Sequence, residues 1–91
     1  MIDDELKSLR KKIDRIDRKI VKLLNMRAKF AHRIGEIKGQ LQMEIYLPQR
    51  EEEVLRNVSQ ENSGPMTDES IISIFKKIIE ETRKIENRSS E

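Results

Sequence analysis

A regular three-four spacing of apolar residues runs through the first 41 residues and constrains the fold more than any other feature. Such a spacing places the apolar side chains on one stripe of an α-helix, as in coiled coils. Ten of the eleven stripe positions are apolar, and the exception is Arg27. The apolar members are Leu6, Leu9, Ile13, Ile16, Ile20, Leu23, Phe30, Ile34, Ile37 and Leu41. The spacing therefore predicts one long helix over residues 3–39, with Gly39 at its end.

Two shorter helices are predicted after this segment. Pro48 stands where a helix favours its first residue, and three glutamates follow it closely, which predicts a helix over residues 48–60. A strong break, Asn62-Ser63-Gly64-Pro65, comes next. Thr67 is a suitable N-cap for a third helix over residues 67–87, whose apolar face is rich in isoleucine.

The predicted elements define an all-α fold with one long, one short and one medium helix. No segment has the alternation of a strand, we expect residues 88–91 to fray, and the whole chain, residues 1–91, is predicted to be one domain. The long helix measures about 54 Å at 1.5 Å per residue. A compact globule of this length has a radius of gyration of only about 12 Å. Because two short helices cannot cover so long a stripe, we expect a second copy of the chain, in a homodimer, to cover the rest.

Composition excludes several kinds of site. The chain has no cysteine and its single histidine, His32, has no second histidine to form a metal pair, so we expect no metal site. The first residues are acidic where a signal peptide is basic, and no apolar run approaches 18 residues, so we expect a cytoplasmic protein without a membrane segment. Residues 1–38 carry a charge balance of +6 and residues 39–91 one of −4. This asymmetry fits either a basic helix packed beside acidic helices or a basic segment facing an anionic partner or ligand.

Arg27 is the stripe residue that most needs an explanation. A cation at an apolar seam is destabilising unless it has a partner. It either pairs with a buried carboxylate, sets the register of the helices, or binds an anionic ligand. Lys38 follows three helical turns later on nearly the same face, with the small residue Ala31 between them. Arg10 lies roughly 25 Å from Arg27 along the helix, so only a second chain can bring an Arg10 to the same place.

Polar residues also interrupt the other two helices at suggestive positions. Thr82 and Glu86 fall on the apolar side of the third helix, as either its frayed end or the wall of a site. The second helix begins beside Arg50 and Glu51, where free N–H groups and the positive end of the helix dipole suit a polar or anionic group. Arginine, lysine and glutamate around an apolar shell suit a reaction that needs no nucleophile and no metal.

Four motifs along the chain form a pattern when they are taken together. They are Leu9-Arg10-Lys11-Lys12-Ile13-Asp14-Arg15-Ile16-Asp17, Leu24-Asn25-Met26-Arg27, Ile34-Gly35-Glu36-Ile37-Lys38 and Pro48-Gln49-Arg50-Glu51. This pattern resembles the all-helical chorismate mutases, and the resemblance covers roughly residues 5–87. It implies an intertwined homodimeric bundle of three-helix chains that converts chorismate to prephenate by a one-step pericyclic rearrangement, without a cofactor, in phenylalanine and tyrosine biosynthesis.

The resemblance implies roles for the residues that match these motifs. Arg27 and Arg10 of the partner subunit would hold the two carboxylates of the substrate, and Thr82 would touch one of them. Lys38 would contact the ether oxygen and a carboxylate, while Glu86 would face the ether oxygen. In this scheme the catalytic residues are Lys38, Glu86 and Arg27.

A second group of residues would recognise the ring hydroxyl. By the same resemblance, Glu51 would accept a hydrogen bond from this hydroxyl and Arg50 would orient that corner of the site. Many members of the family have Asp where this chain has Leu47, of which only the backbone could serve.

Two other functions compete with this interpretation. An isochorismate-pyruvate lyase of the same fold would use nearly the same cationic pocket. A non-enzymatic coiled-coil or nucleic-acid-binding module would use the basic first helix and would show a strong salt dependence, but it leaves Arg27 unexplained. We favour the mutase, with a small dianionic substrate as its ligand and neither nucleic acid nor a membrane as a partner.

Overall fold

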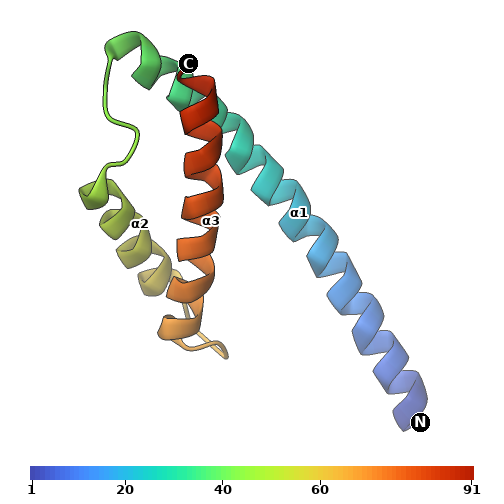
Figure 1. Cartoon of the computed structure of the whole chain (residues 1–91). Helices are drawn as coiled ribbons and strands as arrows, with labels where there is room; N and C mark the ends of the chain where they lie inside the picture. The colour runs from blue at the N-terminus through green and yellow to red at the C-terminus, as the bar shows by residue number, and fades with distance from the viewer.

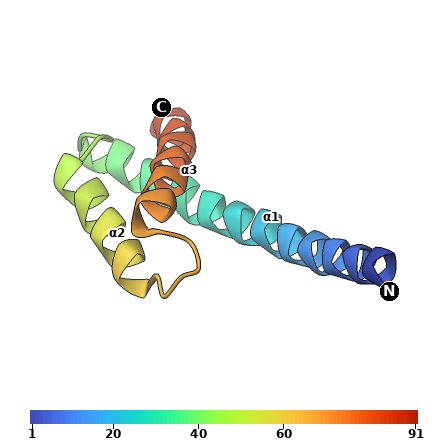
Figure 2. The ribbon, with the colours of Figure 1, turned by 90° about the horizontal axis from the view of Figure 1, so that it is seen from below.

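The computed structural model describes all 91 residues and consists of three α-helices. They are α1 (Ile2–Leu41), α2 (Pro48–Glu61) and α3 (Asp68–Ser89). Helix α1 projects as a long arm, and α3 crosses its C-terminal half (Figure 1, Figure 2). Helix α3 packs against both α1 and α2, whereas α1 and α2 do not pack on each other. The predicted all-α fold with one long, one short and one medium helix is confirmed.

The starts of the two shorter helices follow the predicted signals. Pro48 is the first residue of α2, which runs one residue beyond the predicted end. Thr67 is the N-cap of α3, and its side-chain oxygen accepts a hydrogen bond from the backbone N–H of Ser70 at 3.1 Å. This bond satisfies one of the N–H groups that a helix start leaves without an internal partner.

The end of α1 differs from the prediction. The helix continues past Gly39 to Leu41 and stops where Gln42 adopts the left-handed conformation, with φ of 54°. The N–H of Gln42 donates to the carbonyl of Gly39, and the N–H of Met43 donates to the carbonyl of Lys38 at 2.8 Å. These paired bonds form a Schellman motif, which ends the helix without a glycine at the left-handed position.

Gly39 and Gly35 instead allow α3 to approach α1 closely. A Cβ atom on Gly35 would lie 2.5 Å from the carbonyl oxygen of Glu86, and one on Gly39 would lie 3.0 Å from the Cα of Ser90. The last turn of α3, where the prediction placed a frayed tail, is therefore helical and packed. There the hydroxyl of Ser89 donates to the Glu86 carbonyl at 3.2 Å.

The core lies only where α3 crosses α1, and it is small. The four buried residues are Ala31, Gly35, Ile79 and Thr82. The chain measures 60 × 23 × 15 Å and has a radius of gyration of 16.9 Å, well above the value of about 12 Å for a compact chain of this length. None of its helices combines the length and apolarity needed to cross a bilayer.

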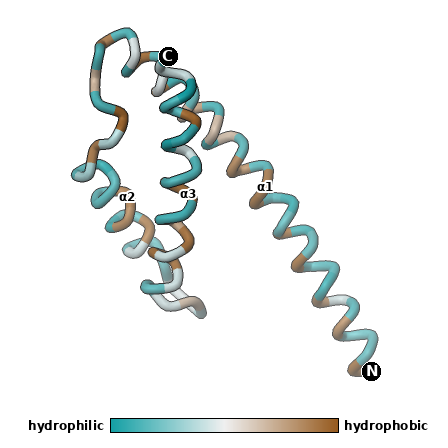
Figure 3. The backbone as a smooth tube through the Cα atoms, viewed as in Figure 1, coloured by the Kyte–Doolittle hydropathy of each residue, from teal (hydrophilic) through white to brown (hydrophobic).

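The N-terminal half of α1 carries its apolar stripe unpartnered. The stripe side chains from Leu6 to Leu23 are between 44% and 61% exposed. Apolar positions recur along the free arm (Figure 3). A contiguous apolar surface of this length is typical of an interface with another chain.

Candidate active site

A cavity of about 370 Å³ lies between the C-terminal half of α1, the start of α2 and the C-terminal half of α3. Four cations, two carboxylates, a threonine and an apolar wall surround it. The polar residues are Arg27, Lys38, Arg50, Arg83, Glu51, Glu86 and Thr82, and the apolar ones are Phe30, Ala31, Ile34, Ile45, Leu47, Val54 and Ile79. Seven of the eight predicted site residues thus meet in one place, and only Arg10 lies elsewhere.

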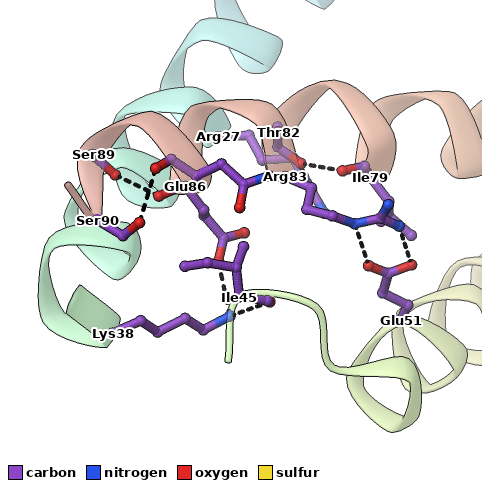
Figure 4. Close-up of polar contacts among 11 residues, drawn as sticks. Arg27, Lys38, Ile45, Glu51, Ile79, Thr82, Arg83, Glu86, Ser89 and Ser90 are labelled. Carbon is purple, nitrogen blue, oxygen red and sulfur yellow. Dashed lines mark hydrogen bonds and ion pairs between the residues drawn. The ribbon is translucent and has the colours of Figure 1, made fainter. Parts of the chain in front are cut away.

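Arg27 enters the cavity from α1 without a carboxylate partner. Its guanidinium donates to the hydroxyl of Thr82 at 2.6 Å. The single hydroxyl proton of Thr82 is shared between the carbonyls of Ile78 and Ile79, and Figure 4 shows the contact with Ile79. Burial and the nearby charge of Arg50 lower the pKa of Arg27, while Glu86 opposes this shift. The guanidinium is therefore held charged in a place that penalises its charge, which is the arrangement expected of a group that binds an anion.

Lys38 and Glu86 form the most enclosed ion pair of the chain. The Lys38 ammonium donates to Glu86 Oε1 at 2.8 Å and to the backbone carbonyl of Ile45 at 3.0 Å (Figure 4). The two side chains are only 13% and 17% exposed. The α1–α3 crossing at Gly35 brings the two residues together, and the turn after α1 delivers the Ile45 carbonyl. Two acceptors thus hold the ammonium at the cavity wall.

Glu51 is engaged in a two-point ion pair that we did not predict. Arg83 Nε donates to Glu51 Oε2 at 2.9 Å, and Arg83 Nη2 donates to Oε1 at 2.7 Å (Figure 4). The Arg83 guanidinium also lies over the Tyr46 ring, 4.7 Å from its centroid. The hydrogen bonds to Glu51 raise the pKa of Arg83. This contact joins α2, α3 and the loop between α1 and α2.

The remaining predicted residues occupy the start of α2. Arg50 lines the cavity but is largely exposed, and its guanidinium pairs with Glu53 outside the cavity. Leu47 is the N-cap residue, and its carbonyl accepts hydrogen bonds from the N–H groups of Arg50 and Glu51 at 3.0 and 3.1 Å. Leu47 offers no side-chain cap, so the polarity of this corner comes from its neighbours.

Arg10 lies on the exposed arm of α1, away from the cavity of its own chain. The rise of the helix puts it roughly 25 Å from Arg27. An Arg10 side chain can complete this cavity only if it comes from a second molecule.

The wall of the cavity carries an excess of positive charge. Its four cations and two carboxylates leave a balance of +2. Lys38 and Arg83 are paired with the two carboxylates of the wall, and Arg50 is paired with Glu53 outside it, so Arg27 is the cation of the wall that has no carboxylate partner. No group of three or more His, Cys, Asp or Glu side chains is placed to hold a metal ion. The arrangement can bind a small dianion and stabilise negative charge that develops on it.

Two features of the site escaped sequence reasoning. Arg83 shares a helix face with Ile79 and Glu86, at intervals of four and three residues, and this spacing could have placed it at the site. The Ile45 carbonyl had no such signal, because any residue provides a backbone oxygen. Thr82 and Glu86, which the sequence left open between a frayed end and a site wall, lie in the wall.

Comparisons with known proteins agree with this geometry. Residues 9–87 match the family model for chorismate mutase type II. A bifunctional chorismate mutase/prephenate dehydratase of Aquifex aeolicus is 42% identical over 89 residues; the match covers 93% of this chain and 25% of the relative, so the chain spans about a quarter of that protein.

Solved structures show the same likeness. Chorismate mutase (form II) from Thermus thermophilus superposes with a TM-score of 0.90 at 38% identity, covering 92% of this chain and 96% of that one. Chorismate mutase from Helicobacter pylori in complex with prephenate superposes with a TM-score of 0.83 at 30% identity, covering 92% and 91%. The matched segment includes every element of the cavity. The chain belongs to the chorismate mutase type II family.

Proposed function

We propose that this chain converts chorismate to prephenate. The observation that carries the proposal is Arg27, a half-buried cation with no carboxylate partner that faces a cavity with a charge balance of +2. Chorismate is a dianion with two carboxylates, so its charge matches that of the wall. The apolar part of the wall suits its ring.

In the proposed complex, Arg27 binds one carboxylate of the substrate and Thr82 contacts the same group. Arg10 of the partner subunit binds the other carboxylate. Arg50 helps to orient the substrate at the corner of the cavity where the ring hydroxyl lies. Holding both carboxylates selects the compact conformer in which the two reacting carbon atoms are close. A cation fixed by its surroundings does this without reorganising during the reaction.

Lys38 and Glu86 act at the ether oxygen. The rearrangement breaks a C–O bond as a new C–C bond forms in the same molecule, so it needs no external nucleophile. Negative charge grows on the ether oxygen in the transition state. Lys38 is already held by the Ile45 carbonyl and by Glu86, and a donor fixed there stabilises the transition state more than the substrate. Glu86 holds the Lys38 ammonium in place at this oxygen.

Glu51 accepts a hydrogen bond from the ring hydroxyl, at the start of α2. Leu47 lines the same corner, where its backbone is the only part of the residue that can offer a polar group. Together these residues orient the ring so that the ether oxygen faces Lys38.

We further propose that two chains form an intertwined homodimer with shared sites. The exposed stripe of α1 and the distance of Arg10 from its own cavity support this assembly. The basic N-terminal segment, with its balance of +6 over residues 1–38, complements the −4 of the remainder. Sedimentation at micromolar concentration tests the dimer, and a folded monomer would contradict it.

We place the reaction in phenylalanine and tyrosine biosynthesis, in the cytoplasm. A relative whose name joins chorismate mutase with prephenate dehydratase supports the pathway. Fractionation of cells that produce the protein tests the location.

Loss of chorismate absorbance on adding the purified protein tests the proposed activity, with the product identified by chromatography. We expect prephenate. Salicylate and pyruvate formed from isochorismate, without prephenate from chorismate, would favour the lyase instead.

A further inference from the structure

We propose that Arg83 is a positioning residue that fixes the Glu51 carboxylate as the acceptor for the ring hydroxyl of the substrate. The inference rests on the proposed function and goes beyond it, because it assigns hydroxyl recognition to a pair of residues rather than to Glu51 alone. The pair joins the C-terminal half of α3 to the first turn of α2.

The geometry of the pair fixes both oxygens of Glu51. Two parallel hydrogen bonds, of 2.7 and 2.9 Å, hold the carboxylate in one plane and one rotation. Each carboxylate oxygen has about two lone-pair sites, so one remains on each oxygen after Arg83 has donated. A substrate hydroxyl can therefore donate to Glu51 while the ion pair stays intact.

Arg83 is itself held by a second contact. Its guanidinium lies 4.7 Å from the centroid of the Tyr46 ring, a cation–π arrangement. Arg83 is 33% exposed and Glu51 is 24% exposed, so water competes only partly for the pair. The loop provides Tyr46, α3 provides Arg83 and α2 provides Glu51. Contacts between three elements therefore fix the Glu51 carboxylate, which would otherwise be free to change rotamer.

Glu51 needs this restraint because it borders two cavities. A second cavity of about 360 Å³ is also lined by both Glu51 and Arg83. The ion pair of Arg83 with Glu51, which we call the bridge, therefore lies between the two cavities. Without Arg83, the Glu51 side chain is free to turn toward the second cavity. The bridge keeps its acceptor sites at the boundary of the site cavity.

The bridge also solves an electrostatic problem. A free carboxylate would repel a dianionic substrate at close range. Arg83 neutralises the charge of Glu51 but leaves its capacity to accept a hydrogen bond. Two of the three guanidinium nitrogens of Arg83, Nε and Nη2, already donate to Glu51. This favours a positioning role for Arg83 over direct binding of a substrate carboxylate.

The test compares chorismate with the same compound lacking the ring hydroxyl. We would measure kcat/KM for both compounds and take their ratio as the hydroxyl discrimination. The variants are Arg83→Leu and Arg83→Lys, with Lys84→Leu as a matched control, because Lys84 is the adjacent cation of α3 and pairs only with Glu81 on the surface. Losses of stability or of overall charge affect both compounds alike and cancel in the ratio.

We expect Arg83→Leu to lower the discrimination about tenfold, the scale of one hydrogen bond to a charged group. Arg83→Lys should give an intermediate ratio, because lysine keeps the charge but makes one contact instead of two. Lys84→Leu should keep the wild-type ratio. If Arg83→Leu does not fold, the Arg83→Lys ratio decides.

Two results would overturn the inference. A wild-type ratio in both Arg83 variants, with or without a loss of overall activity, would mean that Arg83 binds a carboxylate or only stabilises the fold. If the wild-type protein converts neither compound, the proposed function fails and the inference fails with it. The wild-type assay therefore separates the two kinds of failure.

Discussion

Replacing Arg27 with leucine should separate activity from stability. The substitution restores an apolar residue to the interrupted stripe of α1. It removes a guanidinium whose pKa is lowered by burial, and it leaves no carboxylate without its partner, because Arg27 forms no ion pair. Thr82, only 7% exposed, still shares its hydroxyl proton between the carbonyls of Ile78 and Ile79. Replacement of buried charges by packed apolar groups is often neutral or stabilising by about 1–4 kcal/mol.

The same substitution should strongly lower the catalytic activity, although stability holds or rises. Losing a preorganised charge-stabilising donor lowers kcat by at least about 10²-fold, or roughly 2.7 kcal/mol of transition-state stabilisation. Thermal melts at one protein concentration and chorismate turnover measure the two effects. Lys29→Leu is the control, since it removes one cation from an exposed position of α1 outside the cavity and should leave turnover unchanged. A strongly destabilised Arg27→Leu variant whose folded fraction keeps full activity would refute the reasoning.

Three other substitutions test separate contacts. Gly35→Ala places a methyl group 2.5 Å from the Glu86 carbonyl, so it should destabilise the fold by about 1–3 kcal/mol and lower turnover by displacing Glu86; an unchanged melt would contradict the close crossing. Glu86→Gln keeps an oxygen that can accept from Lys38 and adds a permanent donor, so we expect turnover to persist; a complete loss of turnover would mean that the reaction needs the charge of Glu86. Hydrogen bonds from Lys84 and Lys77 lower the pKa of Glu81, so its contribution to stability is present at neutral pH and is lost as the pH falls through that lowered pKa. Glu81→Gln should therefore lower the melting temperature slightly at neutral pH and not in strong acid, and an equal effect at both would contradict the ion pairing.

Local patterns were enough to predict the helices and most of the polar residues of the cavity wall. The three-four spacing fixes the face of α1, so it also places Arg27 and Lys38 on one side without knowledge of the other helices. Pro48 and Thr67 act through their own backbone and nearest neighbours, which is why their helix starts were predictable.

The features that were not predicted depend on packing between helices. Gly39 is typical of a helix end, yet its lack of a Cβ serves the approach of Ser90, and the helix ends later. The last turn of α3 has the composition of a frayed tail, yet it is ordered by that same approach. The contact between Arg83 and Glu51 joins residues 32 positions apart, and no local rule relates their separation in space.

The most direct test of the account mixes two inactive chains. We expect Arg10→Ala and Arg27→Ala each to abolish most formation of prephenate, because every site needs an Arg27 and Arg10 of the partner subunit. After equal mixing and subunit exchange, half of the dimers are mixed and each has one intact site, so activity should return to about a quarter of the wild-type value. Exchange is confirmed with differently tagged chains. No recovery of prephenate formation after confirmed exchange would contradict the shared cationic site.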